Sequence, residues 1–251
     1  MKFSPKIYVF DFDGVVCEST DECLVSAWNA WEAWQSGDRF RKKISEFTEL
    51  EKNRFQSVRP RVRGAGEYYI LQRAFSENIE IKDQRFYELL GREWREHLEP
   101  FKAVFLEMRE RLRLKDRSYW INLHPVYDEV LDFMRELHSR DLLYLATLKD
   151  RTSVAAILES QGIRIPEERL LDQSQISTKL DALDIYAARL KRPKRDFIFI
   201  DDNVTHLLAP KRAGYSVMLA AWGSGSEEYR SIAVENGIPI LDSWREIPRH
   251  K

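Results

Sequence analysis

The stretch that decides the fold is residues 7–14, which read Ile-Tyr-Val-Phe-Asp-Phe-Asp-Gly. Its first four residues are β-branched or aromatic, and they predict a buried strand that ends before a glycine. Asp11 and Asp13 follow that strand two positions apart. Two nearby carboxylates repel each other, and each holds its proton more tightly unless a cation offsets the charge. The stretch therefore predicts a metal-assisted site at the end of a buried strand.

Three more short apolar runs predict strands, at residues 142–146, 197–200 and 215–220. None of them alternates apolar with polar residues, which is typical of parallel strands covered on both faces. Helical patterns at about 154–162 and 180–190 lie between them, so strand and helix alternate from about residue 121 onward. This alternation predicts an α/β fold in three layers, with a doubly wound, Rossmann-type parallel sheet.

A long insertion separates the first predicted strand from the second. About 130 residues lie between them, whereas a crossover unit needs only about 30. Aromatic residues at helical spacing, such as Trp28, Trp31 and Trp34, predict the core of a small helical bundle there. We expect residues 1–16 and 121–251 to form the α/β domain, 17–120 to form an all-helical cap, and Pro125 to start the first crossover helix.

Composition limits the class of protein. The 251 residues are 43% hydrophobic and carry a formal net charge of -1, which predicts a folded chain with no general affinity for nucleic acid. No apolar run approaches the roughly 20 residues of a membrane helix, and the first twenty residues lack a signal-peptide profile. We therefore expect a cytoplasmic protein without a membrane or nucleic-acid partner; the oligomeric state stays open.

Polar residues follow three of the four predicted strands, at the edge where open parallel sheets bind their ligands. Asp11 and Asp13 follow the first strand, Thr147 the second, and Asp201 with Asp202 the third. Lys179 lies near the start of a predicted helix, where it opposes the helix dipole at a cost of roughly 0.3–1 kcal/mol unless it serves an anion.

Several carboxylates without a histidine or cysteine cluster suit a hard cation such as Mg²⁺. Phosphate oxygens commonly complete the coordination shell of this ion. Thr147 and Lys179 can then donate hydrogen bonds to the same phosphoryl group. In this interpretation Asp11 attacks phosphorus, and Asp13 protonates the leaving oxygen and later deprotonates water. The sequence thus predicts a Mg²⁺-dependent phosphomonoester hydrolase that forms an aspartyl-phosphate and acts on a small phosphorylated metabolite.

The order of these motifs resembles the haloacid dehalogenase (HAD) superfamily of phosphohydrolases. Residues 11–16 resemble its first motif, Thr147 the second, Lys179 the third and Asp201-Asp202 the paired-acid form of the fourth. A helical insertion directly after the first motif is similar to the cap of phosphoglycolate phosphatases and phosphomutases. The resemblance implies that Asp11, Asp201 and the Asp13 carbonyl coordinate Mg²⁺ and that Asp202 supports the metal. Leu180 is a departure, because the family places proline after the lysine.

Other residues are weaker candidates for the site. Arg59, Arg61 and Arg63 lie in a predicted cap loop that could contact a second anionic group of the substrate, or they form a solvated basic face. Lys149 could support the site from behind the reacting groups. His206 fits a structural or exposed position better than a place in the site.

Two other functions stay open at this point. A phosphomutase would use the same nucleophile and the same acid, and would differ in how well the closed cap excludes water. A catalytically silent member that acts as a binding or regulatory module is less favoured, because such members usually lack the nucleophile or the metal-binding acids, and both are present here.

Overall fold

The computed structural model describes residues 5–223 and 226–249 of the chain. The chain divides into two compact units, one made of Met1–Glu18 with Pro125–Lys251 and the other of Ser19–His124. The first boundary between the units lies two residues later than expected, and the second lies four residues later. The first unit is called the core unit below, and the second the helical unit.

The core unit contains a six-stranded sheet in which every pair of neighbouring strands is parallel. Its order is β3-β2-β1-β4-β5-β6, so the chain winds outward from β1 in one direction and then in the other. This arrangement confirms the predicted doubly wound α/β fold. The strands are β1 (Ile7–Phe10), β2 (Leu143–Ala146), β3 (Leu170–Leu171), β4 (Phe197–Asp201), β5 (Ser216–Ala220) and β6 (Ile240–Leu241).

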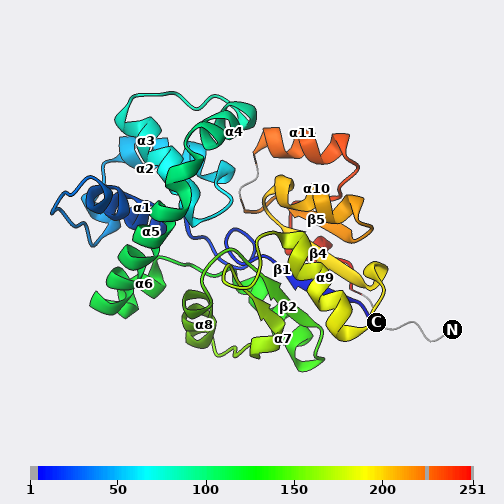
Figure 1. Ribbon diagram of the computed structural model, residues 1–251. Coiled ribbons are helices and arrows are strands. Elements are labelled where there is room, and N and C mark those ends of the chain that lie inside the picture. The colour runs from blue at the N-terminus through cyan, green and yellow to red at the C-terminus, as the bar shows by residue number, and fades with distance from the viewer. Residues whose placement is uncertain (1–4, 224–225, 250–251) are drawn as a thin grey trace. The chain divides into compact units, whose positions relative to one another are not determined.

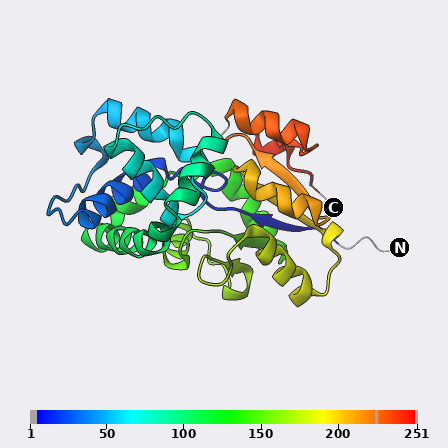
Figure 2. The ribbon, with the colours of Figure 1, turned by 45° about the horizontal axis from the view of Figure 1, so that its top comes forward.

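Helices cover both faces of this sheet (Figure 1). Tyr8 of β1 packs edge-on against Phe133 of α7, with ring centroids 5.5 Å apart. Tyr144 of β2, in register with the neighbour of Tyr8, points to the opposite face and packs against Tyr186 of α9 at 4.9 Å. Figure 2 shows α10 and α11, in orange, packed side by side. The helices of this unit are α7 (Asp128–Ser139), α8 (Arg151–Ser160), α9 (Lys179–Leu190), α10 (Val204–Arg212) and α11 (Glu227–Glu235).

The structure differs from the expectation at two kinds of place. The four predicted strands are present with ends shifted by no more than one residue, but β3 and β6 were not predicted, because two residues each give too short a pattern. The first crossover helix starts at Asp128 rather than at Pro125. Residues 125–127 stay outside the helix because they pair with the loop after β1: Glu18 N donates to Pro125 O, and Tyr127 N donates to Val16 O.

The helical unit contains no strand among its described residues, as the sequence predicts. Trp31 and Trp34 of α1 form an aromatic core with Tyr69 of α3 and Phe101 of α5, with ring centroids 5.6–6.4 Å apart. The α-helices are α1 (Thr20–Trp34), α2 (Glu49–Val58), α3 (Tyr68–Ser76), α4 (Gln84–Glu93), α5 (Arg95–Lys115) and α6 (Arg117–Asn122). Over the described ranges, no helix is both long and apolar enough to cross a bilayer.

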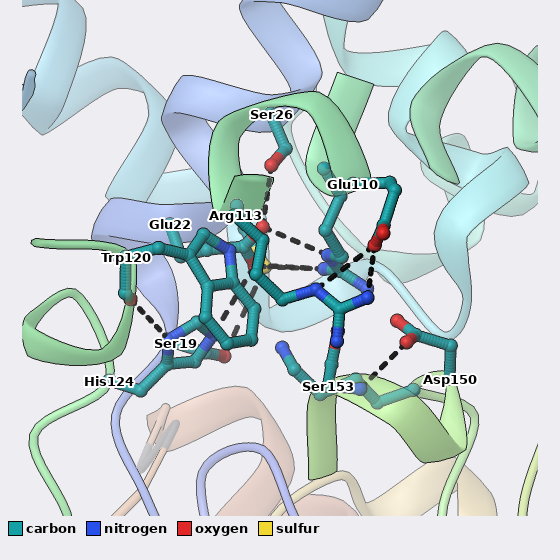
Figure 3. Close-up of polar contacts among 12 residues, drawn as sticks. Ser19, Glu22, Ser26, Glu110, Arg113, Trp120, His124, Asp150 and Ser153 are labelled. Atoms are coloured by element: carbon teal, nitrogen blue, oxygen red, sulfur yellow. Dashed lines mark hydrogen bonds and ion pairs between the residues drawn. The ribbon is translucent and has the colours of Figure 1, made fainter. Parts of the chain in front are cut away.

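A buried ion pair joins the two longest helices of this unit. Arg109 of α5 donates from Nε and Nη2 to the two carboxylate oxygens of Glu22 on α1, both at 2.9 Å. Ser26 Oγ donates to Glu22, and the His124 ring lies 3.6 Å from it (Figure 3). Both charged groups are almost fully buried. A bidentate arginine–carboxylate pair fixes the helices in register, since either charge alone would be costly there.

Candidate active site

The carboxylates of Asp11 and Asp201 end two neighbouring strands. Phe10 of β1 is in register with Ile200 of β4, and Asp11 N donates to Ile200 O at 2.9 Å. The next residue on each strand is therefore an aspartate, and both side chains lie at the carboxyl edge of the sheet. Asp11 is 7% exposed and Asp201 is fully buried. Two acids in this setting need positive charge close by.

Lys179 supplies that charge in the structure. Its Nζ lies 2.6 Å from Asp11 Oδ1 and 3.4 Å from Asp201 Oδ2, and it donates to the Ala146 carbonyl at 2.7 Å. The lysine is the first residue of α9, whose N-cap Thr178 and third residue Asp181 form a capping box. This cap compensates for a buried cation at the positive end of the helix dipole.

The two acids differ in their affinity for protons. Burial raises the pKa of Asp11 above its ordinary value; Lys179 opposes that rise, and the neighbouring Asp201 adds to it. Burial also acts to raise the pKa of Asp201, but His206 and Lys179 outweigh it and hold the pKa low. Asp11 therefore holds its proton more tightly than Asp201 does.

His206 belongs to this cluster, although the sequence favoured a structural or exposed place for it. Its Nδ1 lies 3.1–3.2 Å from both oxygens of Asp201, and ligand atoms of Asp11, Asp201 and His206 all lie within 4.8 Å of one another. Its Nε2 is buried and has no hydrogen-bond partner among the described residues. The signal in the sequence was its position in the first turn of the helix after the strand that Asp201 ends.

This donor set can be tested against a divalent metal. Two carboxylates within reach of one centre fit Mg²⁺, which usually takes one or two carboxylates from the protein and fills its shell with water and phosphate oxygens. The imidazole nitrogen suits Mn²⁺ and later first-row metals better than Mg²⁺. The residues present therefore fit a divalent cation, with a donor set more mixed than the all-oxygen set that the sequence predicted.

Asp13 and Lys149 form a second pair on the core unit. Lys149 Nζ lies 3.1 Å from Asp13 Oδ1, and the lysine side chain is completely buried. Lys149 N donates to Thr147 Oγ1 at 3.1 Å, so the two predicted residues after β2 are in direct contact. Thr147 is itself 1% exposed, and because its hydroxyl accepts that bond it keeps its own proton to donate.

Asp202 lies against the loop that follows Asp13. A Cβ atom on Gly14 would come within 2.1 Å of Asp202 Oδ2, and one on Gly223 would meet the Gly14 carbonyl at 2.1 Å and Asp202 Cβ at 2.8 Å. Gly14 also has a φ of +78°, which L-residues rarely adopt. Any larger residue at either glycine would displace Asp202 and the loop that positions Asp13.

The three cap arginines belong to the helical unit and have partners there. Arg63 pairs with Glu67 at 2.9 Å and lies 3.8 Å from Glu88, so its charge is matched within the unit. Arg61 Nη1 donates to the Ser57 carbonyl at 3.1 Å. Arg59 lies 5.8 Å from the centroid of the Tyr68 ring. The candidate site residues of the core unit thus form two adjoining sets. A substrate contact for Arg59, Arg61 or Arg63 stays a prediction.

Solved structures with the same fold are numerous. A predicted phosphoglycolate phosphatase from Haemophilus somnus 129PT has a TM-score of 0.64 at 14% identity, covering 98% of each chain. A haloacid dehalogenase-like family hydrolase from Streptococcus pneumoniae has a TM-score of 0.63 at 13% identity, covering 97% of this chain and 96% of that one. CbbY from Rhodobacter sphaeroides, solved as a variant in complex with xylulose-(1,5)bisphosphate, gives 0.58 at 18% identity, with 97% and 96% covered.

The sequence also matches a family model, although no curated protein matches it. The model describes haloacid dehalogenase-like hydrolases and matches residues 5–214, a range that holds every motif residue of the core unit and the whole helical unit. The structural neighbours share the fold at low identity. Because the family model matches most of its length, the chain belongs to the haloacid dehalogenase-like hydrolase family.

Proposed function

We propose that this protein is a Mg²⁺-dependent phosphomonoester hydrolase that acts on a small phosphorylated metabolite through an aspartyl-phosphate on Asp11. The observation that carries the proposal is the contact of Asp11 with Lys179 at 2.6 Å beside the buried Asp201. This arrangement gives one carboxylate a compensated charge at the sheet edge while the second stays anionic. A phosphoryl group placed there would meet both a nucleophile and a cation.

Each residue has a distinct task in the proposed reaction. Asp11 attacks phosphorus, the bond from phosphorus to the leaving oxygen breaks, and Asp13 delivers a proton to that oxygen. Asp13 then takes a proton from water, which attacks phosphorus and restores Asp11. Thr147 and Lys179 donate hydrogen bonds to the phosphoryl oxygens, on which negative charge is concentrated.

The metal would be held by Asp11 and Asp201, with the Asp13 carbonyl and His206 nearby and Asp202 in support. When bound, Mg²⁺ supplies the positive charge that lets an anionic nucleophile approach an anionic substrate. The helical unit would supply contacts to the rest of the substrate, with Arg59, Arg61 and Arg63 as the proposed contributors. A cytoplasmic location fits such substrates, because their charge keeps them from crossing membranes.

The proposal is tested by phosphate release across a panel of sugar phosphates, nucleotides and phospho-acids, with and without Mg²⁺. We expect Mg²⁺-dependent release of inorganic phosphate from at least one compound and loss of that release in the Asp11→Asn variant. Lys194→Gln serves as the control, because Lys194 lies near the surface of the same unit and pairs with Asp184. Conversion of a sugar phosphate to an isomer without free phosphate would show a mutase, and no turnover on any compound would contradict the proposal.

A further inference from the structure

The helical unit contains a pocket that the proposed reaction does not use. Its volume is about 370 Å³, within the range of sites that bind small organic molecules. One side is formed by Lys42 and Lys43, just before the short 3₁₀ helix Ile44–Glu46. The other side is formed by the end of α5 and by α6. All the lining residues belong to the helical unit.

The floor of the pocket is apolar and buried. Leu112, Trp120 and Leu123 line it and are each 5% exposed or less. Figure 3 shows the backbone carbonyl of Trp120 bonded to the His124 ring, a contact of 2.9 Å. Tyr119 fixes the two sides to each other, because its hydroxyl accepts a hydrogen bond from Ile44 N at 2.9 Å. The proton of that hydroxyl remains to be donated.

The rim of the pocket carries an excess of positive charge. Lys42, Lys43 and Lys115 line it, against a single acid, Asp116. The Asp116 carboxylate caps α6 by accepting from Tyr119 N at 2.9 Å, and three lysines against this one acid leave the rim with a net excess of two positive charges. Over the residues that the structure describes, the ammonium groups of the three lysines make no ion pair with any carboxylate.

The groups next to the three lysines make other contacts. Glu46 accepts from the backbone N–H groups of Lys42 and Lys43 at 2.9 and 2.8 Å, which folds the loop, and both lysines are exposed. Lys115 Nζ lies 4.2 Å from the centroid of the Phe40 ring, which Arg111 also contacts. Desolvation lowers the pKa of Lys115, and the positive charges of Arg111 and Lys42 lower it further. An anion among these groups would relieve that repulsion.

We propose that this pocket is a binding site for a small organic phosphate with an apolar or aromatic body. Its phosphate would lie among the three ammonium groups and the Tyr119 hydroxyl, and its body would pack on Leu112, Trp120 and Leu123. Multiply charged phosphate suits three lysines on one rim better than a monoanion does, since each ammonium adds a separate point charge. The site is independent of the proposed function, because binding there requires no turnover.

The test uses 1-naphthyl phosphate as the probe, in EDTA so that turnover does not consume it. The readout is the ¹H–¹⁵N cross-peak of the Trp120 indole, assigned with Trp120→Phe, because this resonance reports on the pocket rather than on the core unit. We expect it to shift in a saturable way with 1-naphthyl phosphate. Equal concentrations of 1-naphthol or of inorganic phosphate should give weaker binding, because 1-naphthol lacks the phosphate and inorganic phosphate lacks the aromatic body.

Two matched triple variants separate the pocket from general electrostatics. The first variant, Lys42→Gln/Lys43→Gln/Lys115→Gln, removes the three positive charges of the rim. The second, Lys52→Gln/Lys82→Gln/Lys102→Gln, removes three positive charges from elsewhere on the helical unit. We expect the first to weaken binding by about tenfold and the second by less than about twofold. Phosphate release should stay unchanged in the rim variant. An unmoved Trp120 cross-peak in the wild type, or equal binding by the two variants, would overturn the proposal.

Discussion

Lys179 Nζ lies 2.6 Å from Asp11 Oδ1, and this contact joins the first turn of α9 to the end of β1. The lysine is buried beside two carboxylates, so it neutralises part of their charge before any ligand arrives. A phosphoryl group at this edge would therefore meet an ammonium that is already in position. Preorganised charge of this kind is the largest single contribution to many enzymatic rate enhancements.

Lys149 should matter most for substrates with poor leaving groups. Its Nζ lies 3.1 Å from Asp13, the proposed acid. We expect Lys149→Met to reduce kcat/KM for alkyl phosphates by about 10²-fold, the lower end of what general acid catalysis contributes, because Asp13 loses the group that positions it. Aryl phosphates, which need little protonation, should lose much less. Steady-state kinetics on both substrate classes check this, and an equal loss on both would contradict a role through Asp13.

His206 should set the choice of metal. An imidazole favours Mn²⁺ over Mg²⁺, so we expect His206→Gln to weaken Mn²⁺ binding by about tenfold and to leave Mg²⁺ binding less affected. Competition between the two ions, followed by the electron paramagnetic resonance of free Mn²⁺, measures the ratio without turnover. His138→Gln is the matched control, since His138 lies on α7 away from the cluster. An unchanged Mn²⁺/Mg²⁺ ratio would exclude His206 from the metal site.

The sheet and the candidate site residues of the core unit could be predicted from the sequence because both depend on local patterns. Four apolar runs located four strands, and the polar residues after three of them were expected at one edge because parallel strands end there. The same patterns could not show that Lys149 contacts Asp13 or that His206 contacts Asp201. Those contacts depend on side-chain directions in loops and first helical turns, where no periodicity exists. Likewise, β3 and β6 are too short for a pattern, and their pairing comes from the tertiary fold.

The buried Glu22–Arg109 pair predicts a clear pattern of stability. Glu22→Gln leaves the Arg109 charge buried without its partner, and we expect it to cost about 3–5 kcal/mol of unfolding free energy. The double variant Glu22→Met/Arg109→Leu should recover much of that loss, because it removes both charges and keeps the volume. Urea unfolding of the three proteins measures the difference. A double variant less stable than Glu22→Gln would show that the pair contributes through its geometry more than through its charge balance.

The hydrogen bond between Tyr215 and Asp184 predicts a contribution to the stability of the core unit that is lost in acid. The Tyr215 hydroxyl donates to Asp184 at 2.7 Å and lowers the pKa of that carboxyl below its ordinary value of 3.8. A depressed pKa gives stability that is present above pH 3.8 and is lost as the pH falls through the lower, folded-state value. We expect Tyr215→Phe to cost less than about 1 kcal/mol at pH 7, since Asp184 is half exposed.

The check is unfolding of Tyr215→Phe and of the wild type at several pH values. The part of the difference that comes from Asp184 should shrink as the pH falls from 3.8 through the lower pKa of folded Asp184, because only below that lower value do both folded proteins carry a protonated carboxyl. A difference that stays constant down to pH 2.5 would show that Tyr215 stabilises the fold by packing alone.

The most direct test of the account is whether Asp11 is the group that takes up phosphorus. Beryllofluoride mimics a phosphoryl group on an aspartate, and its bound form gives separate ¹⁹F resonances. We predict such resonances for the wild type with Mg²⁺ and beryllofluoride, and their loss in Asp11→Asn or without Mg²⁺. Bound resonances that persist in Asp11→Asn, or that never form in a wild type that releases phosphate, would contradict the proposed aspartyl-phosphate.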